Sequence, residues 1–231
     1  MSTNNLPTQY DQQAIDYANS PKAVGYISSA WFEFEQRSIL RWLGYDQPQT
    51  IVPHQILDVG CGVGLFSQPL TSHHSVIGLD ISPAQLQQAQ QKGIKPITGS
   101  GFKAPFLSHH FDKVFLIEVI QHFEFQHGLD LITELTRLVA PGGEIIIVAR
   151  NHYSLVRKIS APTLRLIGRQ QFQLYGYQPA QLGKLLTKLH FCDIQTAFIF
   201  PPVNYFQVND GATSIAKYIG SSFVIKGKKQ R

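Results

Sequence analysis

The chain has 231 residues, with 20 Lys and Arg against 15 Asp and Glu, and so a formal net charge of +5. Apolar residues make up 43% of it and charged residues only 15%, which excludes disorder over most of the chain and suits one hydrophobic core. No stretch approaches the roughly 18 apolar residues of a membrane-spanning helix. Two cysteines and no basic-then-apolar leader give neither a disulfide framework nor a secretion signal, so we expect a cytoplasmic protein.

The first part of the chain is predicted to be helical. Apolar residues recur at helical spacing over residues 10–43, with interruptions. We therefore assign residues 1–45 to an N-terminal helical cap and residues 46–231 to the main domain.

The main domain alternates short apolar strands with helices. Strands are predicted at 55–59, 75–80, 95–98, 113–117, 144–149, 194–200 and 221–225, and helices at 65–71, 82–92, 127–138 and 179–189. This alternation predicts an α/β fold, a parallel sheet with helices on both faces. Residues 151–174, after the fifth strand, are less regular and are predicted to form a lid.

A glycine-rich turn follows the first strand, with Gly60, Gly62 and Gly64 at alternate positions. Such glycines permit a tight turn and close approach of a ligand to the backbone, and the N-terminus of the predicted next helix would present unpaired N–H groups. Asp80 ends the next strand, where an acid can accept hydrogen bonds from ribose hydroxyls. The spacing is G-x-G-x-G rather than the G-x-G-x-x-G of dinucleotide sites. Asp58, two positions before the first glycine, suits a cationic ligand with an amino group and a sulfonium better than a pyrophosphate.

These residues resemble the class I S-adenosylmethionine-dependent methyltransferases, in particular the small-molecule group related to ubiquinone and menaquinone pathway enzymes. The resemblance covers roughly residues 55–150 and rests on four ordered motifs, at 56–64, 76–82, 105–114 and 138–143. It implies a Rossmann-like, doubly wound, seven-stranded sheet whose last strand is antiparallel. It also implies S-adenosyl-L-methionine as the cofactor.

The resemblance implies a set of cofactor-binding residues around the glycine turn and the strand ends: Asp58, Gly60, Cys61, Gly62, Asp80, Ile81, Ser100, Gly101, Phe102 and Ile117. Asp58 would hold the amino end of the methionine portion, which the backbone of residues 60–62 would line. Asp80 would bind the ribose and Ile81 would pack on the adenine. Ser100 stands where the family often has an aspartate, and a hydroxyl accepts a hydrogen bond from the adenine amino group more weakly than a carboxylate does.

His122 is the candidate catalytic residue. It follows the fourth strand, where an open parallel sheet presents its carboxyl ends to a ligand, and an imidazole there can take a proton from a phenol or an acid. A histidine that only caps the strand is the alternative. The run from Glu118 to His122 resembles the Glu-x-x-Glu-His of ubiquinone-pathway catechol O-methyltransferases, in which the acids and the histidine help to bind a divalent metal. Here Gln121 replaces one acid, so no metal ligand is assigned.

The stretch after the fifth strand is basic. Between Glu144 and Asp193 it has no carboxylate but seven Lys and Arg, interleaved with apolar residues. Such a stretch contacts an anionic membrane surface or closes over an anionic substrate, and a solvated helix face is the alternative. No DNA partner is expected, because the fourth strand lacks the Asn/Asp-Pro-Pro-Tyr signature that holds a flipped base.

The leading hypothesis is therefore a methyltransferase that uses S-adenosylmethionine to methylate a small molecule, with O-methylation of a phenolic or anionic lipophilic acceptor by in-line transfer. Three alternatives stay open: an RNA or protein methyltransferase, a cofactor-binding subunit without transferase activity, and a nicotinamide oxidoreductase. The acceptor and the oligomeric state are not determined by the sequence.

Overall fold

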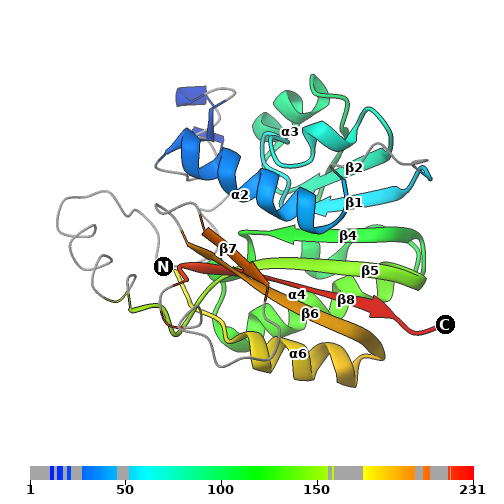
Figure 1. Ribbon diagram of the computed structural model, residues 1–231. Helices are drawn as coiled ribbons and strands as arrows, with labels where there is room; N and C mark the ends of the chain where they lie inside the picture. Colours follow the sequence, from blue (N-terminus) through cyan, green and yellow to red (C-terminus); the bar gives the residue numbers. More distant parts are fainter. Residues whose placement is uncertain are drawn as a thin grey trace.

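The computed structural model describes residues 11–12, 15–17, 20–21, 28–45, 52–155, 158, 174–200, 205–208, 218 and 220–231. In these residues an eight-stranded sheet has the order β3-β2-β1-β4-β5-β8-β6-β7 (Figure 1). Its strands are β1 Gln55–Val59, β2 Ser75–Asp80, β3 Lys95–Thr98, β4 Phe111–Ile117, β5 Val139–Arg150, β6 Phe191–Phe200, β7 Tyr205–Val208 and β8 Ser222–Lys229. The α-helices are α2 Ser29–Trp42, α3 Pro83–Gln90, α4 Phe125–Leu138 and α6 Pro179–Lys188.

The first five strands run parallel, and the order of strands along the chain reverses between β1 and β4. β8 lies between β5 and β6 and is antiparallel to both, which confirms the predicted antiparallel last strand. All seven predicted strands are present. β7 is an additional edge strand that pairs antiparallel with β6. β7 was not predicted, because a run of four residues is too short to be distinguished from the connection in which it lies.

Helices cover both faces of the sheet, as predicted (Figure 1). α4 and α6 lie on one face, where they bury Leu131, Leu135, Leu182 and Leu186 in one hydrophobic cluster. α2 and α3 lie on the other, where they bury Phe32, Ile39, Leu86 and Ala89 in a second. Because both faces are covered, β5 has a continuous buried run from Ile145 to Ala149. The strand ends that carry the site therefore belong to a sheet with packed helices on both faces.

The prediction of a helix at 65–71 is wrong. This segment forms turns and one short 3₁₀-helix, Gln68–Leu70. Pro69 lies within it, has no N–H to donate, and its ring would clash with the carbonyl of Leu65 in an α-helix. The glycine turn is therefore followed by further turns, and no α-helix N-terminus contributes its N–H groups there. The helices predicted at 82–92, 127–138 and 179–189 are present as α3, α4 and α6.

Two predictions about domains stay predictions. α2 is helical as the cap at 1–45 requires, but most residues before it lie outside the described part of the chain. The lid at 151–174, with its expected membrane contact, also lies largely outside it. No described helix has the length and apolar character needed to cross a membrane.

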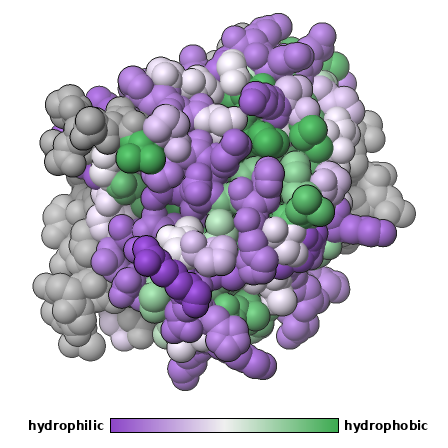
Figure 2. All heavy atoms as spheres, turned by 90° about the vertical axis from the view of Figure 1, so that its right-hand side faces the viewer, coloured by the Kyte–Doolittle hydropathy of each residue, from purple (hydrophilic) through white to green (hydrophobic). Residues whose placement is uncertain are grey.

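The amino ends of the parallel strands lie at the right of Figure 1, and Figure 2 shows this side of the molecule. Hydrophilic residues predominate on it, and the hydrophobic ones form separate groups. Lys113 of β4 forms an ion pair with Glu144 of β5, its register partner, and the Lys226 ammonium lies 4.6 Å from the ring centre of Trp42. The first contact joins β4 to β5, and the second joins β8 to α2.

Candidate functional site

A cavity of about 530 Å³ opens at the carboxyl ends of β1, β2 and β4. It lies where the strand order reverses, the usual place for a ligand in an open α/β sheet, and its volume suits a small molecule. All eleven residues singled out in the sequence line it: Asp58, Gly60, Cys61, Gly62, Asp80, Ile81, Ser100, Gly101, Phe102, Ile117 and His122. The fold brings them together because the carboxyl ends of parallel strands meet at one edge.

The glycine turn presents bare backbone to the cavity. Gly60, Gly62 and Gly64 have φ angles of +69°, +55° and +77°, a region that L side chains rarely adopt. A Cβ on Gly60 would in addition collide with the side chain of Val119. The thiol of Cys61 points away, towards Gly78, and burial raises its pKa. Cys61 is therefore assigned no thiol chemistry at the cavity.

Two buried carboxylates flank this turn. Asp58 is 2% exposed and accepts a hydrogen bond from Ser67 Oγ at 2.6 Å. Asp80 is 8% exposed and accepts from the backbone N–H groups of Gly62, at 2.8 Å, and of Ser82, at 2.9 Å. Neither has a cationic partner among the described residues.

Burial changes the acidity of both carboxylates. It raises the pKa of Asp58 to about 7, with a smaller contribution from the neighbouring Asp80 and an opposing one from the hydrogen bond of Ser67. It also raises the pKa of Asp80, against the backbone hydrogen bonds that this carboxylate accepts. Unpaired buried negative charge is unfavourable unless a ligand brings positive charge and hydrogen-bond donors. The sulfonium, amino group and ribose hydroxyls of S-adenosylmethionine meet this requirement.

Aromatic side chains form another part of the cavity wall. Phe102, 39% exposed, packs edge to face on Phe123 with ring centres 4.9 Å apart. Gly101 leaves no room for a side chain, since its Cβ would lie 2.9 Å from Leu131 and from Val59. Ser100 begins the short 3₁₀-helix Gly101–Lys103, and its hydroxyl accepts a hydrogen bond from the N–H of Phe102 at 3.3 Å.

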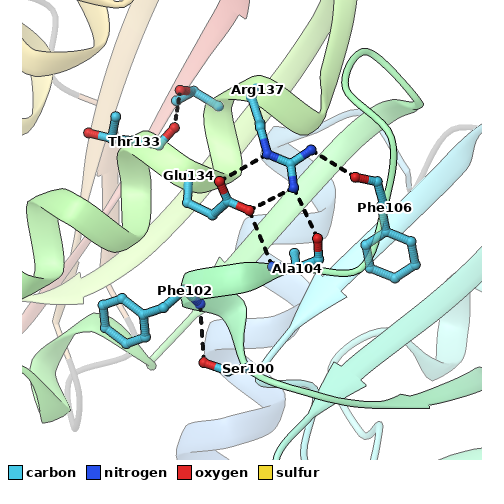
Figure 3. Close-up of polar contacts among 8 residues, drawn as sticks. Ser100, Phe102, Ala104, Phe106, Thr133, Glu134 and Arg137 are labelled. Atoms are coloured by element: carbon cyan, nitrogen blue, oxygen red, sulfur yellow. Dashed lines mark hydrogen bonds and ion pairs between the residues drawn. The ribbon is translucent and has the colours of Figure 1, made fainter.

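Arg137 of α4 holds the loop that carries this wall (Figure 3). Its guanidinium donates to the carbonyl oxygens of Phe106 at 2.7 Å and Ala104 at 3.0 Å. It also forms a two-pronged pair with Glu134, at 2.9 and 2.7 Å, and Glu134 accepts a hydrogen bond from the N–H of Ala104. This pair was not predicted from the sequence. Its signal is a Glu and an Arg three positions apart on one helix, which says nothing about the distant loop.

His122 lies at the third side of the cavity, after β4. It is half-buried, and burial together with the positive charge of Arg150 lowers the pKa of His122 to about 4. The imidazole is therefore neutral at physiological pH. Glu118 also lines the cavity, and Gln121 donates through Nε2 to Glu118 Oε2 at 2.7 Å. Gln121 thus places a hydrogen-bond donor against Glu118, at the position where the resemblance has a second acid.

Other residues that line the cavity were not predicted, among them Phe32, Phe66, Phe123, His127 and Leu131. They come from α2, from the turns after the glycine run, from the residue that follows the 3₁₀-helix Ile120–His122, and from the first half of α4. No local motif marks them, because they reach the cavity only through the packing of helices on the sheet.

Comparison with known proteins agrees with this arrangement. Residues 57–147 match the family model described as Methyltransferase domain. A malonyl-[acyl-carrier protein] O-methyltransferase of Legionella pneumophila is 33% identical over 152 residues, which are 62% of this chain and 49% of that protein. A probable chloroplastic tocopherol O-methyltransferase of rice is 29% identical over 161 residues, 63% of this chain and 44% of that protein. The chain thus spans about half the length of these curated relatives.

A solved structure shares the fold. Magnesium protoporphyrin IX methyltransferase of Synechocystis, crystallised with bound S-adenosylhomocysteine, has a TM-score of 0.69 at 18% identity and is aligned over 98% of this chain and 97% of its own. The predicted Rossmann-like fold and the resemblance drawn from the four motifs are both confirmed. Residues 57–147 thus match a methyltransferase domain, and the fold of the chain is shared with a solved S-adenosylhomocysteine-binding methyltransferase.

Proposed function

We propose that the protein transfers the methyl group of S-adenosylmethionine to an oxygen atom of a small molecule, a phenolic or anionic lipophilic acceptor. The observation that carries the proposal is that one cavity is lined both by buried carboxylates and by a neutral imidazole. Asp58 and Asp80 are buried without a cationic partner among the described residues, and a neutral imidazole, that of His122, lines the same cavity.

Each lining residue then has a role in holding the cofactor. Asp58 would accept hydrogen bonds from the amino group, beside the bare backbone at Gly60 and Gly62. Asp80 would accept from the ribose hydroxyls with the lone pairs that its two backbone partners leave free. Ile81 and Phe102 supply apolar surface for the adenine. When bound, the cofactor supplies a methyl group on a positively charged sulfur.

Alignment and exclusion of water are the main contributions of the protein to an in-line displacement, and can be worth roughly 7–11 kcal/mol. In the reaction the acceptor oxygen forms a bond to the methyl carbon as the carbon–sulfur bond breaks. A phenol also has to lose its proton, and His122 accepts it. A weakly basic imidazole is sufficient, because the hydroxyl becomes strongly acidic as its oxygen is alkylated. An acceptor that is already anionic needs no base.

The test begins with binding of S-adenosylhomocysteine, measured by calorimetry. Labelled S-adenosylmethionine is then incubated with fractionated cell extract, and the methylated product is examined for an ether, an ester or an N-methyl group. For a phenolic acceptor, His122→Asn should lower kcat by about 10²–10⁴-fold. For a carboxylate acceptor the same variant should retain its rate. Failure to bind S-adenosylhomocysteine, or a methyl group found on nitrogen, would contradict the proposal.

A further inference from the structure

Asp11 contacts the start of α3, although 71 positions of the sequence separate it from Ser82. Asp11 Oδ1 accepts a hydrogen bond from Ser82 Oγ and a long one, of 3.4 Å, from the backbone N–H of Ala84. Asp11 is half-buried, and Ser82 is 0% exposed. α3 has no acid in its own first turn, so Asp11 supplies from a distant segment the negative charge that a helix N-terminus favours.

Ser82 links this contact to the cofactor cavity. It is the N-cap residue of α3, and its Oγ accepts a hydrogen bond from the N–H of Gln85 at 3.2 Å while it donates to Asp11. Its backbone N–H donates to Asp80 Oδ1 at 2.9 Å. A serine hydroxyl has one proton, so donation to Asp11 fixes the direction of that proton and leaves a lone pair for Gln85. One buried residue thus holds Asp11, the start of α3 and Asp80 together.

Asp80 is held on both of its carboxylate oxygens. Oδ1 accepts from the N–H of Ser82, and Oδ2 accepts from the N–H of Gly62 at 2.8 Å. Asp80 lines the cavity, whereas Asp11 and Ser82 lie behind it and do not. A carboxylate whose direction is fixed in advance loses little freedom when it binds a pair of ribose hydroxyls. The contact of Ser82 therefore prepares Asp80 for the ribose.

Asp11 and Asp80 also interact through their charges. Burial is the main cause of the raised pKa of Asp80, and the negative charge of Asp11 raises it further. Two like charges near each other disfavour ionised Asp80, and hydrogen-bond donors that reach this carboxylate reduce the cost. The hydroxyls of a bound ribose are such donors, so ribose binding and the contact of Asp11 with Ser82 support each other.

We infer that Asp11 is a positioning residue for the cofactor, which fixes through Ser82 the carboxylate of Asp80 that binds the ribose hydroxyls. This inference rests on the proposed function, in which Asp80 accepts hydrogen bonds from the ribose. Asp11 does not touch the cofactor itself, because it does not line the cavity. A residue near the beginning of the chain thus takes part in recognition of the ribose at the end of β2.

Two nucleosides separate this positioning role from a general effect on stability. Adenosine has both ribose hydroxyls and 2′,3′-dideoxyadenosine has neither, and ligand-observed NMR measures their affinities, with displacement by S-adenosylhomocysteine to verify the site. The original chain should bind adenosine about 10–100-fold more tightly than the dideoxy compound. In Asp11→Ala this preference should fall by about fivefold, with the affinity for the dideoxy compound unchanged. A merely structural role would weaken binding of both nucleosides alike and leave the preference as it is.

Two further variants in the same part of the chain make the comparison specific. Asp11→Asn keeps an acceptor oxygen for Ser82 Oγ and should therefore retain most of the preference for adenosine. Asp16→Ala is the matched control, because Asp16 is exposed and accepts a hydrogen bond from Gln12 rather than from α3. It should keep the whole preference.

Ser82→Ala tests the route independently and replaces Asp11→Ala if that variant does not fold. It removes the hydroxyl through which Asp11 acts, so it should lower the preference by a similar factor, and Asp11→Ala added to it should cause no further loss. An unchanged preference in both single variants overturns the positioning role alone. An original chain that binds S-adenosylhomocysteine but does not prefer adenosine overturns the ribose role of Asp80 and this inference with it. No binding of S-adenosylhomocysteine by the original chain would instead overturn the proposed function.

Discussion

Replacement of Asp58 by Asn should stabilise the protein without cofactor and at the same time weaken cofactor binding. Asp58 is buried, and its pKa is raised from the ordinary 3.8 to about 7. The folded protein is therefore penalised whenever this carboxyl group is ionised. Asn has nearly the same shape and carries no charge, so it removes the penalty.

The size of the effect follows from the pKa of Asp58. One pKa unit corresponds to about 1.36 kcal/mol, so ionised Asp58 costs the folded state about 4 kcal/mol at pH 7.5. The substitution also weakens the hydrogen bond from Ser67, which destabilises the variant by about 1 kcal/mol. The variant should thus be more stable by about 3 kcal/mol, which raises Tm by about 6–12 °C in a chain of this size.

The gain should depend on pH in a defined direction. Between about pH 4 and pH 7 the folded protein keeps a proton on Asp58 that the unfolded chain has lost, so this group makes stability fall as pH rises. The advantage of Asp58→Asn should therefore shrink to within about 1 kcal/mol at pH 5. The lowered pKa of His122 has the opposite effect on stability, but it is common to both proteins and cancels in the comparison.

Urea unfolding at pH 5 and pH 7.5 measures this difference, with Asp130→Asn, an exposed position on α4, as the control. Calorimetry with S-adenosylhomocysteine should show affinity lower by about 10–100-fold in Asp58→Asn, the loss of one charge-assisted hydrogen bond. If the variant is no more stable at pH 7.5, or if its advantage does not depend on pH, the burial argument is wrong. If it is more stable but binds the ligand unchanged, the assignment of Asp58 to the amino group is wrong.

Two further substitutions test the walls of the cavity. Arg137→Met removes four hydrogen bonds of a partly exposed guanidinium, and should lower the free energy of unfolding in urea by about 2 kcal/mol. Because Arg137 holds the loop that carries Phe102, the variant should also bind S-adenosylhomocysteine more weakly. Unchanged affinity would show that the loop keeps its place without Arg137. Gly60→Ala places a methyl group against Val119 at positive φ and should lower the free energy of unfolding by more than about 3 kcal/mol. Gly44→Ala, at φ +84° with open space around it, is the control and should lower it by only about 1–2 kcal/mol. Equal losses in the two variants would argue against the collision with Val119.

The sequence was most informative where burial alone determines structure. Strands β1, β2 and β3 were predicted with their observed bounds, because a short apolar run between turns in an α/β chain usually forms a buried strand. The helix predicted at 65–71 from its apolar pattern is absent, because Pro69 disfavours an α-helix there. β5 begins five residues earlier than predicted, since its first residues include the Pro141-Gly-Gly run that ordinarily marks a turn.

The residues of the site also differ in how far the sequence predicts them. Residues at strand ends and in the glycine turn could be placed together from topology alone, since a parallel sheet brings its carboxyl ends to one edge. Arg137 and Phe123 could not, because their contacts join segments that only tertiary packing brings together.

The position of β8 has a consequence for biosynthesis. It is the last of the described strands along the chain, yet it lies between β5 and β6. A ribosome delivers strands in chain order, so β5 and β6 both emerge before β8, the strand that pairs with an edge of each in the folded protein. Open apolar edges recruit other chains. Until β8 is available, the edges of β5 and β6 that it covers in the folded protein have no partner, and pairing with another chain competes with folding there.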